Sequence, residues 1–343
     1  MPNIRRRMHH DLPNNNICVV FRLGRLGDVV LSTGVLQRIA EERNLSFLYI
    51  VKKDFAPVLQ GLPFIKETIA LENRDLTPVN FLRFCRNFAA RHSALSFLDL
   101  HNTPRSRLLS MLMRGPTLRC RKAGLKRRLF LASGGRLFRQ GLRAASVTQR
   151  YYAAFDDTAP PAALLLPVVK LSERERQSAR ARLDAVFSPG ARPLALHPYA
   201  THKLKALPAR NIHEFASLLD RRGIPLLILG QGDSVFTGRA GDLSNASSLR
   251  ELCALLSLCR ALVCSDSGPM HLASAVGTPI IALFGPTTRE WGFYPAGERD
   301  IVLEKDLPCR PCSLHGESAC PYDCRCLTSI SPEEILAAVQ RVQ

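Results

Sequence analysis

The chain has 343 residues, a formal net charge of +18 at pH 7 and a hydrophobic share of 46%. This length fits two domains of ordinary size, and the apolar share is enough for two cores. No apolar run approaches the roughly eighteen residues that a membrane-spanning helix needs, so we expect no transmembrane segment.

The N-terminal segment, residues 1–16, is charged, and only a strand-length apolar run follows it at residues 17–21. A secretory signal peptide needs a longer apolar region, so we expect none. We therefore expect the chain to stay in the cytoplasm.

In the first half, residues 17–22 predict a strand and residues 23–27 a glycine loop. Residues 28–43 predict a helix, because their apolar side chains recur at helical spacing. Residues 45–51 and 94–99 predict two more strands. The second of these ends at Asp99, and polar side chains follow it.

A basic window then covers residues 105–150, which contain thirteen Lys and Arg, and no acidic residue lies between Asp99 and Asp156. A field of this sign attracts phosphate-rich partners: nucleic acid, an anionic membrane or an anionic glycolipid. The alternative is a solvated face that serves solubility. Aromatic residues are sparse in the window and no nucleic-acid motif accompanies them, which argues against base stacking.

In the second half, residues 158–163 lead into a linker, and a new series of strands and helices begins. Helices are predicted at residues 171–187, with Ser172 and Glu175 as a capping box, and at residues 209–222 and 249–258. Strands are predicted at residues 194–197 and 226–229. A last helix follows the capping box of Ser331 and Glu334. The alternation of strands and helices predicts the α/β class.

The most informative segment is residues 261–287. It predicts a buried strand at 261–264, a loop at 266–269, a small-residue helix at 270–276 and a second buried strand at 280–284. The loop lies at the carboxyl end of its strand, where open parallel sheets bind ligands. The free N–H groups and the positive dipole end of the helix point to the same place, so this cradle suits a diphosphate.

Asp28 is the first candidate site residue, and it has two interpretations. A carboxylate that follows a glycine loop is a common helix N-cap. It can also serve as a general base at the top of the first strand. Gly24 and Gly27 would let a substrate approach the backbone closely. The loop reads G-x-x-G and not G-x-G-x-x-G, so the nicotinamide fingerprint is absent.

Three further residues each have a functional and a structural interpretation. Lys205 is either a solvated loop lysine or a point charge that holds a phosphate. Asp233 follows Gly230-Gln231-Gly232 and is either a turn residue or a ligand of the two ribose hydroxyls. His271 either satisfies backbone groups near its helix start or donates to a phosphate.

The chain has eleven cysteines, and five of them cluster near its C-terminus. They are Cys309, Cys312, Cys320, Cys324 and Cys326. C-x-x-C with later cysteines is typical of a zinc site, which would use Cys309, Cys312, Cys320 and Cys326 as a structural metal site. The spacing is irregular and no second C-x-x-C exists, so packed thiols are the alternative. The chain lacks a D-x-D pair, a P-loop and H-E-x-x-H. What remains is metal-free chemistry on a nucleotide diphosphate.

Four segments together resemble glycosyltransferase family 9, the lipopolysaccharide heptosyltransferases. They are FRLGRLGD at 21–28, KALP at 205–208, DSGPMH at 266–271 running into FGPT at 284–287, and CRPC at 309–312 running into ISPEE at 330–334. The resemblance spans about residues 17–340. The family often has Trp before the Pro where this chain has Leu207.

The resemblance implies a GT-B fold, two Rossmann-like domains that face a cleft. It implies an acceptor-binding domain at residues 1–165, a nucleotide-sugar-binding domain at 166–328 and a C-terminal helix at 329–343. The implied donor is ADP-L-glycero-β-D-manno-heptose, transferred with inversion and without a required metal. The alternatives are a family 9 relative that uses another nucleotide sugar, and a basic nucleic-acid-binding protein.

The resemblance also implies the roles of individual residues. The general base falls on Asp28. Donor-binding residues are Thr201, Lys205, Asp233, Asp266, Ser267, Gly268, Pro269, Met270 and His271. Acceptor-binding residues are Gly24, Arg25, Gly27, Arg105, Arg107, Arg121 and Lys122. The acceptor is an anionic Kdo–lipid A core, so the basic window is expected to meet it at the cytoplasmic surface of the inner membrane, and no nucleic acid is expected as partner.

Overall fold

The structure is a computed structural model that describes residues 16–233, 235–236, 238–316 and 319–342. Most of the N-terminal segment on which the signal-peptide expectation rests, residues 1–15, lies outside this part of the chain. Among the described residues, no helix combines the length and the apolar character needed to cross a bilayer.

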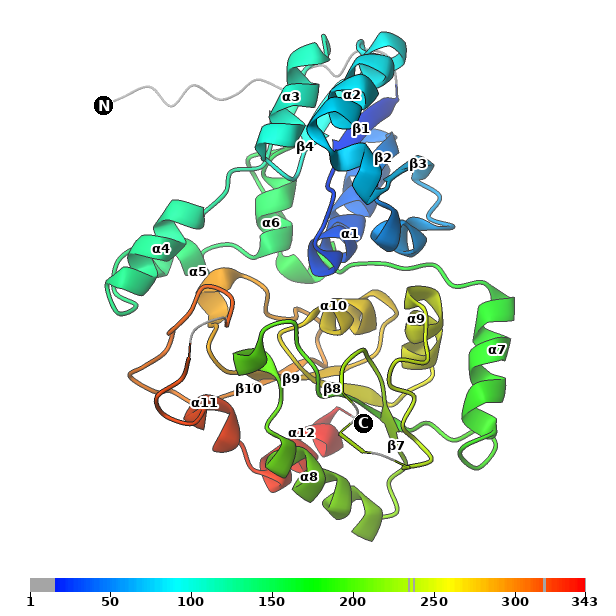
Figure 1. Cartoon of the computed structure of the whole chain (residues 1–343), viewed down its shortest axis with the longest axis vertical. Coiled ribbons are helices and arrows are strands. Elements are labelled where there is room, and N and C mark those ends of the chain that lie inside the picture. The colour runs from blue at the N-terminus through cyan, green and yellow to red at the C-terminus, as the bar shows by residue number, and fades with distance from the viewer. Residues whose placement is uncertain (1–15, 234, 237, 317–318, 343) are drawn as a thin grey trace.

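The N-terminal half is built on a five-stranded parallel sheet with strand order β3-β2-β1-β4-β5. Its strands are β1 (Ile17–Phe21), β2 (Ser46–Lys52), β3 (Ile65–Leu71), β4 (Ser96–Asp99) and β5 (Thr117–Arg119). Its helices are α1 (Leu26–Arg43), α2 (Pro78–His92), α3 (Pro104–Leu112), α4 (Gly124–Ala132), α5 (Arg139–Arg143) and α6 (Val147–Tyr152), with short 3₁₀ helices η1 (Lys53–Leu59) and η2 (Asn73–Leu76). Figure 1 shows this half above the other.

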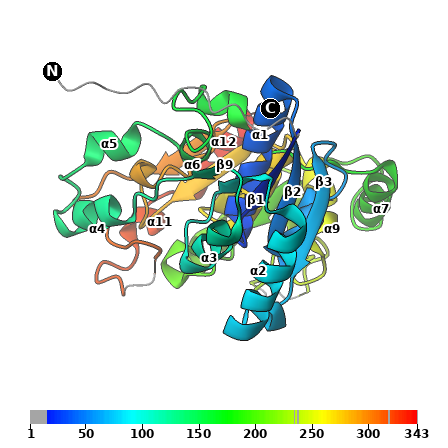
Figure 2. The same cartoon turned by 90° about the horizontal axis from the view of Figure 1, so that it is seen from above.

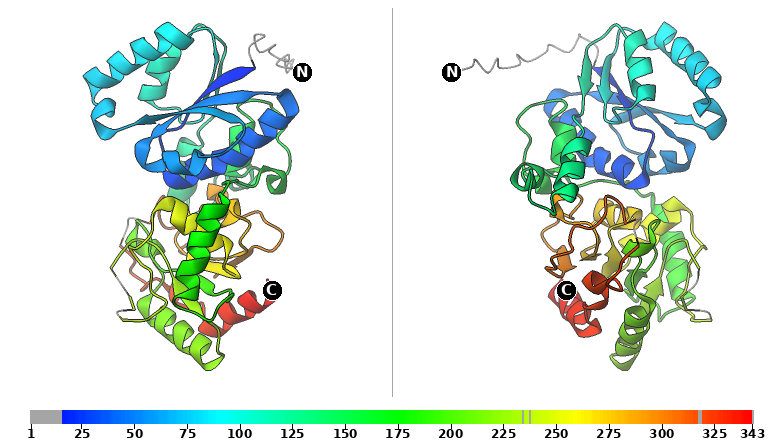
Figure 3. Two further views of the ribbon diagram at one scale, coloured as in Figure 1. Left: turned by 90° about the vertical axis from the view of Figure 1, so that its right-hand side faces the viewer. Right: turned by 60° about the vertical axis from the view of Figure 1, so that its left-hand side comes forward.

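The C-terminal half holds a second five-stranded parallel sheet, with strand order β10-β9-β8-β6-β7. Its strands are β6 (Leu194–His197), β7 (Leu226–Ile228), β8 (Ala261–Ser265), β9 (Ile280–Phe284) and β10 (Ile301–Glu304). Its helices are α7 (Glu173–Asp184), α8 (Ala209–Arg221), α9 (Leu249–Ser257), α10 (Gly268–Ala275), α11 (Arg325–Thr328) and α12 (Pro332–Arg341), with 3₁₀ helices η3 (Ala162–Leu165), η4 (Lys203–Lys205) and η5 (Arg289–Trp291). Both views of Figure 3 show the N-terminal half above the C-terminal half.

Burial explains why these sequences form central strands. All residues of β6, β8 and β9 are buried, as expected for parallel strands covered on both faces. In each sheet the strand order reverses once, between β1 and β4 in the N-terminal half and between β6 and β8 in the C-terminal half. Such reversals open a crevice at the carboxyl ends of the strands, where doubly wound folds bind ligands. The predicted α/β class is confirmed.

The two halves share one apolar core. Its largest cluster contains buried side chains from both halves, including Val35 of α1 and Met270 of α10. The segment that joins the halves passes between these helices: the Val168 N–H donates to Thr33 Oγ1 at 2.8 Å, and the Val169 N–H donates to the Ala275 carbonyl at 3.0 Å. The connection is therefore packed into the structure and does not run free across the surface.

Two local predictions are wrong. α1 begins at Leu26 with Arg25 as its N-cap, so Asp28 is the third helical residue and not the cap. Gly268 and Pro269, expected in a loop, form the first turn of α10. Proline is tolerated there because the first helical N–H groups have no intrahelical acceptor. In both cases the helix starts earlier than the apolar periodicity indicates.

Candidate active site

The carboxylate of Asp28 is held by two side chains of the N-terminal half. Arg22, at the end of β1, forms an ion pair with Asp28 Oδ2 and also donates to the Leu100 carbonyl at 2.7 Å. The Tyr151 hydroxyl, from α6, donates to Asp28 Oδ1 at 2.6 Å. Burial, and then the charge of Asp28, raise the pKa of Tyr151 well above its ordinary value, so this phenol stays protonated and acts as the donor. Asp28 is therefore fixed in orientation, with 17% of its side chain exposed.

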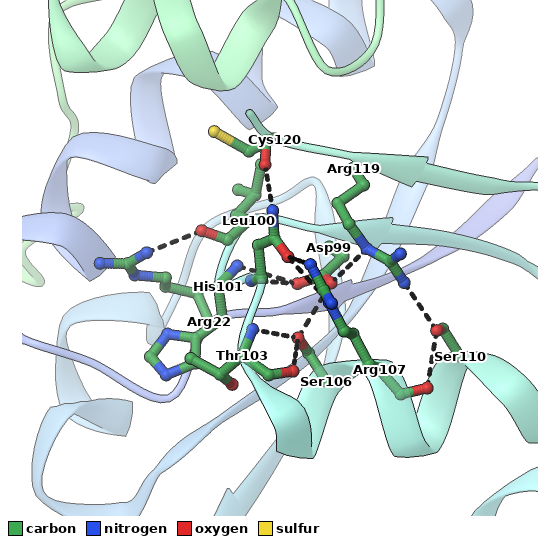
Figure 4. Close-up of polar contacts among 11 residues, drawn as sticks. Arg22, Asp99, Leu100, His101, Thr103, Ser106, Arg107, Ser110, Arg119 and Cys120 are labelled. Atoms are coloured by element: carbon green, nitrogen blue, oxygen red, sulfur yellow. Dashed lines mark hydrogen bonds and ion pairs between the residues drawn. The ribbon is translucent and has the colours of Figure 1, made fainter. Parts of the chain in front are cut away.

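A buried carboxylate shapes the loop after β4 (Figure 4). Asp99 is fully buried and accepts from the backbone N–H groups of His101, at 3.0 Å, and Asn102, at 2.6 Å. It also accepts from Ser106 Oγ and from Arg119 Nε, each at 2.9 Å. A carboxylate with four donors is satisfied in the interior, so Asp99 holds this loop rigid at the crevice between β1 and β4.

His101 projects from that loop toward the same crevice. Burial, and then the charges of Arg22 and Lys122, lower the pKa of His101 to about 4, so the ring is neutral at physiological pH. Its Nδ1 is buried and has no hydrogen-bond partner among the residues that the structure describes. The sequence indicated polar groups at this strand end but did not single out His101.

The C-terminal half places the segment that is predicted to bind a diphosphate at the start of α10. Ser267 is the N-cap of α10 and makes no side-chain cap bond; its hydroxyl donates to the Ser265 carbonyl at 3.2 Å and lies 3.3 Å from Nδ1 of His197. The first N–H groups of α10 thus lack a side-chain acceptor, and they point out of the sheet crevice between β6 and β8. The helix dipole adds a positive potential at the same end.

Lys205 and Asp266 meet beside this cradle. The Lys205 ammonium lies 2.5 Å from Asp266 Oδ2, and both side chains are at most 14% exposed. Thr287 Oγ1 donates to the same Asp266 oxygen at 3.0 Å. The ion pair with Asp266 thus holds the Lys205 ammonium near the start of α10. A phosphate oxygen can compete with the Asp266 carboxylate for this ammonium.

His271 lies where the two halves meet. Its ring is buried, and burial lowers its pKa, while the nearby charges of Asp266 and Asp28 act in the opposite direction. A Cβ at Gly27 would lie 2.6 Å from His271 Cδ2, so only glycine lets the first loop approach this ring. A Cβ at Gly268 would lie 3.0 Å from Leu26 Cδ2. The first turn of α1 and the DSGPMH segment therefore contact each other directly.

The other predicted donor residues are less engaged. Met270 is buried behind the cradle and Pro269 lies in its first turn. Thr201 and Asp233 are exposed, and neither has a hydrogen bond or ion pair with another described residue that would fix it at the cradle. The predicted ribose contact of Asp233 stays a prediction.

The predicted acceptor residues do not all lie in one place. Arg25 Nη1 lies 3.2 Å from His202 Nε2 and so bridges the halves, and Lys122 lies near Arg22, whose charge adds to desolvation in lowering the pKa of Lys122. Arg105 instead donates to the Leu76 carbonyl at 3.0 Å, and Arg107 to Asn102 Oδ1 at 3.2 Å. Arg121 is exposed. The space beside Gly24 is filled by the Phe55 ring, 2.6 Å from where its Cβ would stand.

The five C-terminal cysteines are free thiols that lie in one region of the chain. Sγ of Cys320 accepts from the Cys324 N–H at 3.3 Å, and burial followed by the charges of Cys309 and Cys320 raises the pKa of Cys312. Within the described part of the chain, no three His, Cys, Asp or Glu side chains are arranged to hold a metal ion. The structural metal site expected from the spacing stays a prediction, and no step below uses it.

Comparisons with known proteins place the chain in a family. Residues 139–322 match the model of glycosyltransferase family 9 (heptosyltransferase), and the chain belongs to this family. It is 30% identical over 100 residues to lipooligosaccharide heptosyltransferase 2 of Campylobacter jejuni, a match that covers 28% of this chain and 29% of that protein. The chain thus matches less than a third of the length of this curated relative.

Two solved structures extend the likeness to the whole fold. The glycosyl transferase family 9 protein from Veillonella parvula superimposes with a TM-score of 0.75 at 20% identity, covering 96% of this chain and 97% of that one. ADP-heptose lps heptosyltransferase II of E. coli gives 0.71 at 19% identity, covering 95% and 98%. The expected GT-B fold, with two Rossmann-like halves, is confirmed.

The sequence missed the residues that hold the predicted ones. Tyr151 lies 123 residues along the chain from Asp28, and no local spacing connects the two. Thr287 stands in the FGPT segment, but its bond to Asp266 was not predicted. The one residue that could have been predicted to hold Asp28 is Arg22, since an arginine at a buried strand end needs a nearby anion.

Proposed function

We propose that this protein transfers heptose from ADP-L-glycero-β-D-manno-heptose to the inner core of lipopolysaccharide, either to Kdo–lipid A or to the first heptose. The N-terminal half would bind the acceptor and the C-terminal half the donor. Family membership and the names of the relatives support this class of reaction. The observation that carries it is the contact between the Asp28 loop and the Lys205–Asp266 cradle around His271.

The C-terminal half would stabilise the leaving group. The diphosphate of ADP would accept from the first N–H groups of α10 and from Lys205, which would exchange Asp266 for a phosphate oxygen. Charge builds on this diphosphate as the sugar leaves, so donors fixed in advance lower the barrier. Backbone groups, a dipole and one ammonium would do this without a divalent metal.

The N-terminal half would activate the acceptor. An acceptor hydroxyl has a pKa far above 7, so Asp28 can take its proton only as the new C–O bond forms. Arg22 and Tyr151 each use one position on the carboxylate, and each oxygen keeps a further lone pair for the hydroxyl. Attack from the side opposite the leaving ADP would invert the anomeric centre in one displacement.

The acceptor explains the charge of the chain. A Kdo–lipid A core carries phosphates and carboxylates, and the basic window supplies cations with no acid between Asp99 and Asp156. Of the predicted acceptor cations, Lys122 lies near Arg22 and Asp28, and Arg25 contacts His202 of the other half. Because the acceptor is anchored in a bilayer, the protein would work at the cytoplasmic face of the inner membrane.

The test combines donor binding with transfer. We expect calorimetry to show binding of the ADP-sugar in preference to UDP- and GDP-sugars, and transfer to a truncated lipid A core in the presence of EDTA. Asp28→Asn should lower kcat at least about 100-fold with donor binding retained. Lys205→Ala should weaken donor binding at least about tenfold, whereas Lys203→Ala, an exposed neighbour, should not change it.

Three results would contradict the proposal. Normal transfer by a folded Asp28→Asn protein would contradict the role of Asp28 as general base. Preference for a UDP- or GDP-sugar would make the chain a family 9 relative with another donor. An equal loss of donor binding in Lys203→Ala and Lys205→Ala would contradict the role of Lys205 in binding the diphosphate.

A further inference from the structure

The α4–α5 segment, residues 124–143, projects from the side of the molecule where the two halves meet (Figures 1 and 2). Its inner side is anchored to the C-terminal half. Phe130 packs edge-on to Trp291 with ring centroids 5.9 Å apart, and Leu142 completes this small cluster. Arg127 donates to the Trp291 carbonyl at 2.6 Å, and Arg143 pairs with Glu290 at 2.7 Å. The segment is therefore a fixed projection.

The same segment exposes large apolar side chains. Leu125 is 71% exposed, Leu129 39%, Leu137 54% and Phe138 45%. These are four of the ten exposed large hydrophobic residues in the described part of the chain, and they fall within one short segment. Such a concentration marks an interaction site, since apolar residues scattered singly over a surface need no explanation.

Phe138 adds an observation of a different kind. Its backbone has φ +64°, the left-handed region that non-glycine residues rarely adopt. An aromatic residue held in this conformation with nearly half of its surface exposed costs stability twice, once in the backbone and once in hydration. That combination indicates that the side chain is presented to a partner.

Cations alternate with these apolar residues along the segment. Lys126, Arg128 and Arg136 are exposed and pair with no acidic side chain among the described residues. A second copy of this surface would bring like charges together. The phosphate backbone of a nucleic acid would pair with the cations but offers no partner for four exposed apolar side chains. Apolar side chains interleaved with free cations instead match the boundary between headgroups and acyl chains of an anionic bilayer.

We propose that the α4–α5 segment docks on an anionic lipid bilayer, with Leu125, Leu129, Leu137 and Phe138 inserted below the headgroups. This inference deepens the proposed function, because a lipid-linked acceptor would then meet the crevice at the membrane surface. Trp291, the chain's one tryptophan, packs beneath the segment and reports by its fluorescence whether the segment stays folded.

The test is co-sedimentation of the full chain with vesicles. Vesicles of phosphatidylcholine with phosphatidylglycerol should bind it, and pure phosphatidylcholine should bind it weakly. Leu125→Ser with Leu129→Ser, and separately Phe138→Asn, should each weaken binding about tenfold. Asn tolerates the left-handed backbone, so Phe138→Asn should keep Tm and Trp291 fluorescence. Val79→Ser, which removes a 69% exposed side chain on α2, is the matched control and should bind as the parent does.

Unchanged binding by both variants, or an equal loss in Val79→Ser, would overturn the inference. So would duplex DNA binding that the same variants weaken to the same degree. Heptose transfer to a water-soluble core fragment separates the two proposals. If vesicle binding behaves as expected and no sugar is transferred, the proposed function fails and the docking surface stands.

Discussion

Two ion pairs face each other across the candidate site, and each holds a charge that the proposed reaction needs. Arg22 holds Asp28, and Asp266 holds Lys205. Both pairs are mostly buried, so the fold holds these side chains in place. A base or a phosphate ligand that is already oriented loses little entropy when substrate binds. The hydroxyl of Tyr151 adds a second constraint on Asp28.

Replacing Tyr151 tests that constraint. Tyr151→Phe removes the hydrogen bond to Asp28 Oδ1 and leaves the ring, which also lies under the Arg22 guanidinium at 5.5 Å. Because the carboxylate loses orientation, we expect kcat to fall about tenfold while the KM for donor changes little. Steady-state kinetics measure both quantities.

The neighbouring tyrosine supplies the control for that experiment. The Tyr152 hydroxyl bonds Glu42, away from Asp28, so Tyr152→Phe should leave kcat unchanged. Equal effects of the two substitutions, or a drop in Tm that accounts for the lost activity of Tyr151→Phe, would argue against a positioning role.

At the scale of elements, the segment that connects the two halves packs directly against α1. Gly34 of α1 faces the backbone of residues 165 and 166: a Cβ there would lie 2.0 Å from the Leu166 carbonyl oxygen and 2.8 Å from that of Leu165. No side chain fits at these distances without movement of backbone. The glycine therefore allows the segment to pass directly over the helix.

Gly34→Ala should accordingly destabilise the protein. The added methyl must push the connecting backbone away from α1, which we expect to cost about 2 kcal/mol in the free energy of unfolding. Gly141→Ala in α5 is the control, since nothing lies within 4 Å of its Cβ position. That substitution should raise stability by roughly 0.5–1 kcal/mol, because alanine favours helix. Equal unfolding midpoints in urea for the two variants would contradict the close packing.

The elements that the sequence predicted well are those specified by local chemistry. The buried apolar runs at 194–197 and 280–284 are strands with those bounds, and the capping boxes at Ser172 and Ser331 begin α7 and α12 as expected. Their signals need no distant partner. The site motif from Asp266 to His271 was found for the same reason.

The elements that were missed depend on distant contacts. β3 was not predicted, because it lies at the edge of the sheet and its buried and exposed residues do not alternate regularly. Helix α4 has one fully buried side chain, Phe130, whose partner Trp291 lies in the other half of the chain. The Tyr151–Asp28 bond spans 123 residues. No spacing rule connects residues so far apart, so packing alone brings them to the site.

At the scale of the whole molecule, three histidines with lowered pKa values lie near the crevices of the two sheets; His197 and His271 are buried and His101 is partly buried. His197 lies at the end of β6 and His101 follows β4, while His271 lies between the halves. Burial lowers the pKa of each, to about 4 for His197 and His101. They are neutral in the folded protein, so its stability depends on pH in a range where few other groups titrate.

The free energy of unfolding should therefore fall as the solution is acidified. His197 ordinarily takes a proton near pH 6.5, but in the fold only near pH 4, so between these values the unfolded chain binds more protons. The stability is fully present above pH 6.5, and His197 alone should remove about 2 kcal/mol of it by pH 5. Urea unfolding at pH 7.5, 6 and 5 measures how the free energy of unfolding changes with pH, above the range in which carboxylates titrate.

His197→Gln should lower stability at pH 7.5 but flatten the slope of stability against pH, because the group that takes the proton is gone. His213→Gln, at an exposed position on α8, should keep the slope of the parent. A parent slope that survives intact in His197→Gln would mean that other groups bind the protons and that this buried imidazole does not set the acid limit of the fold.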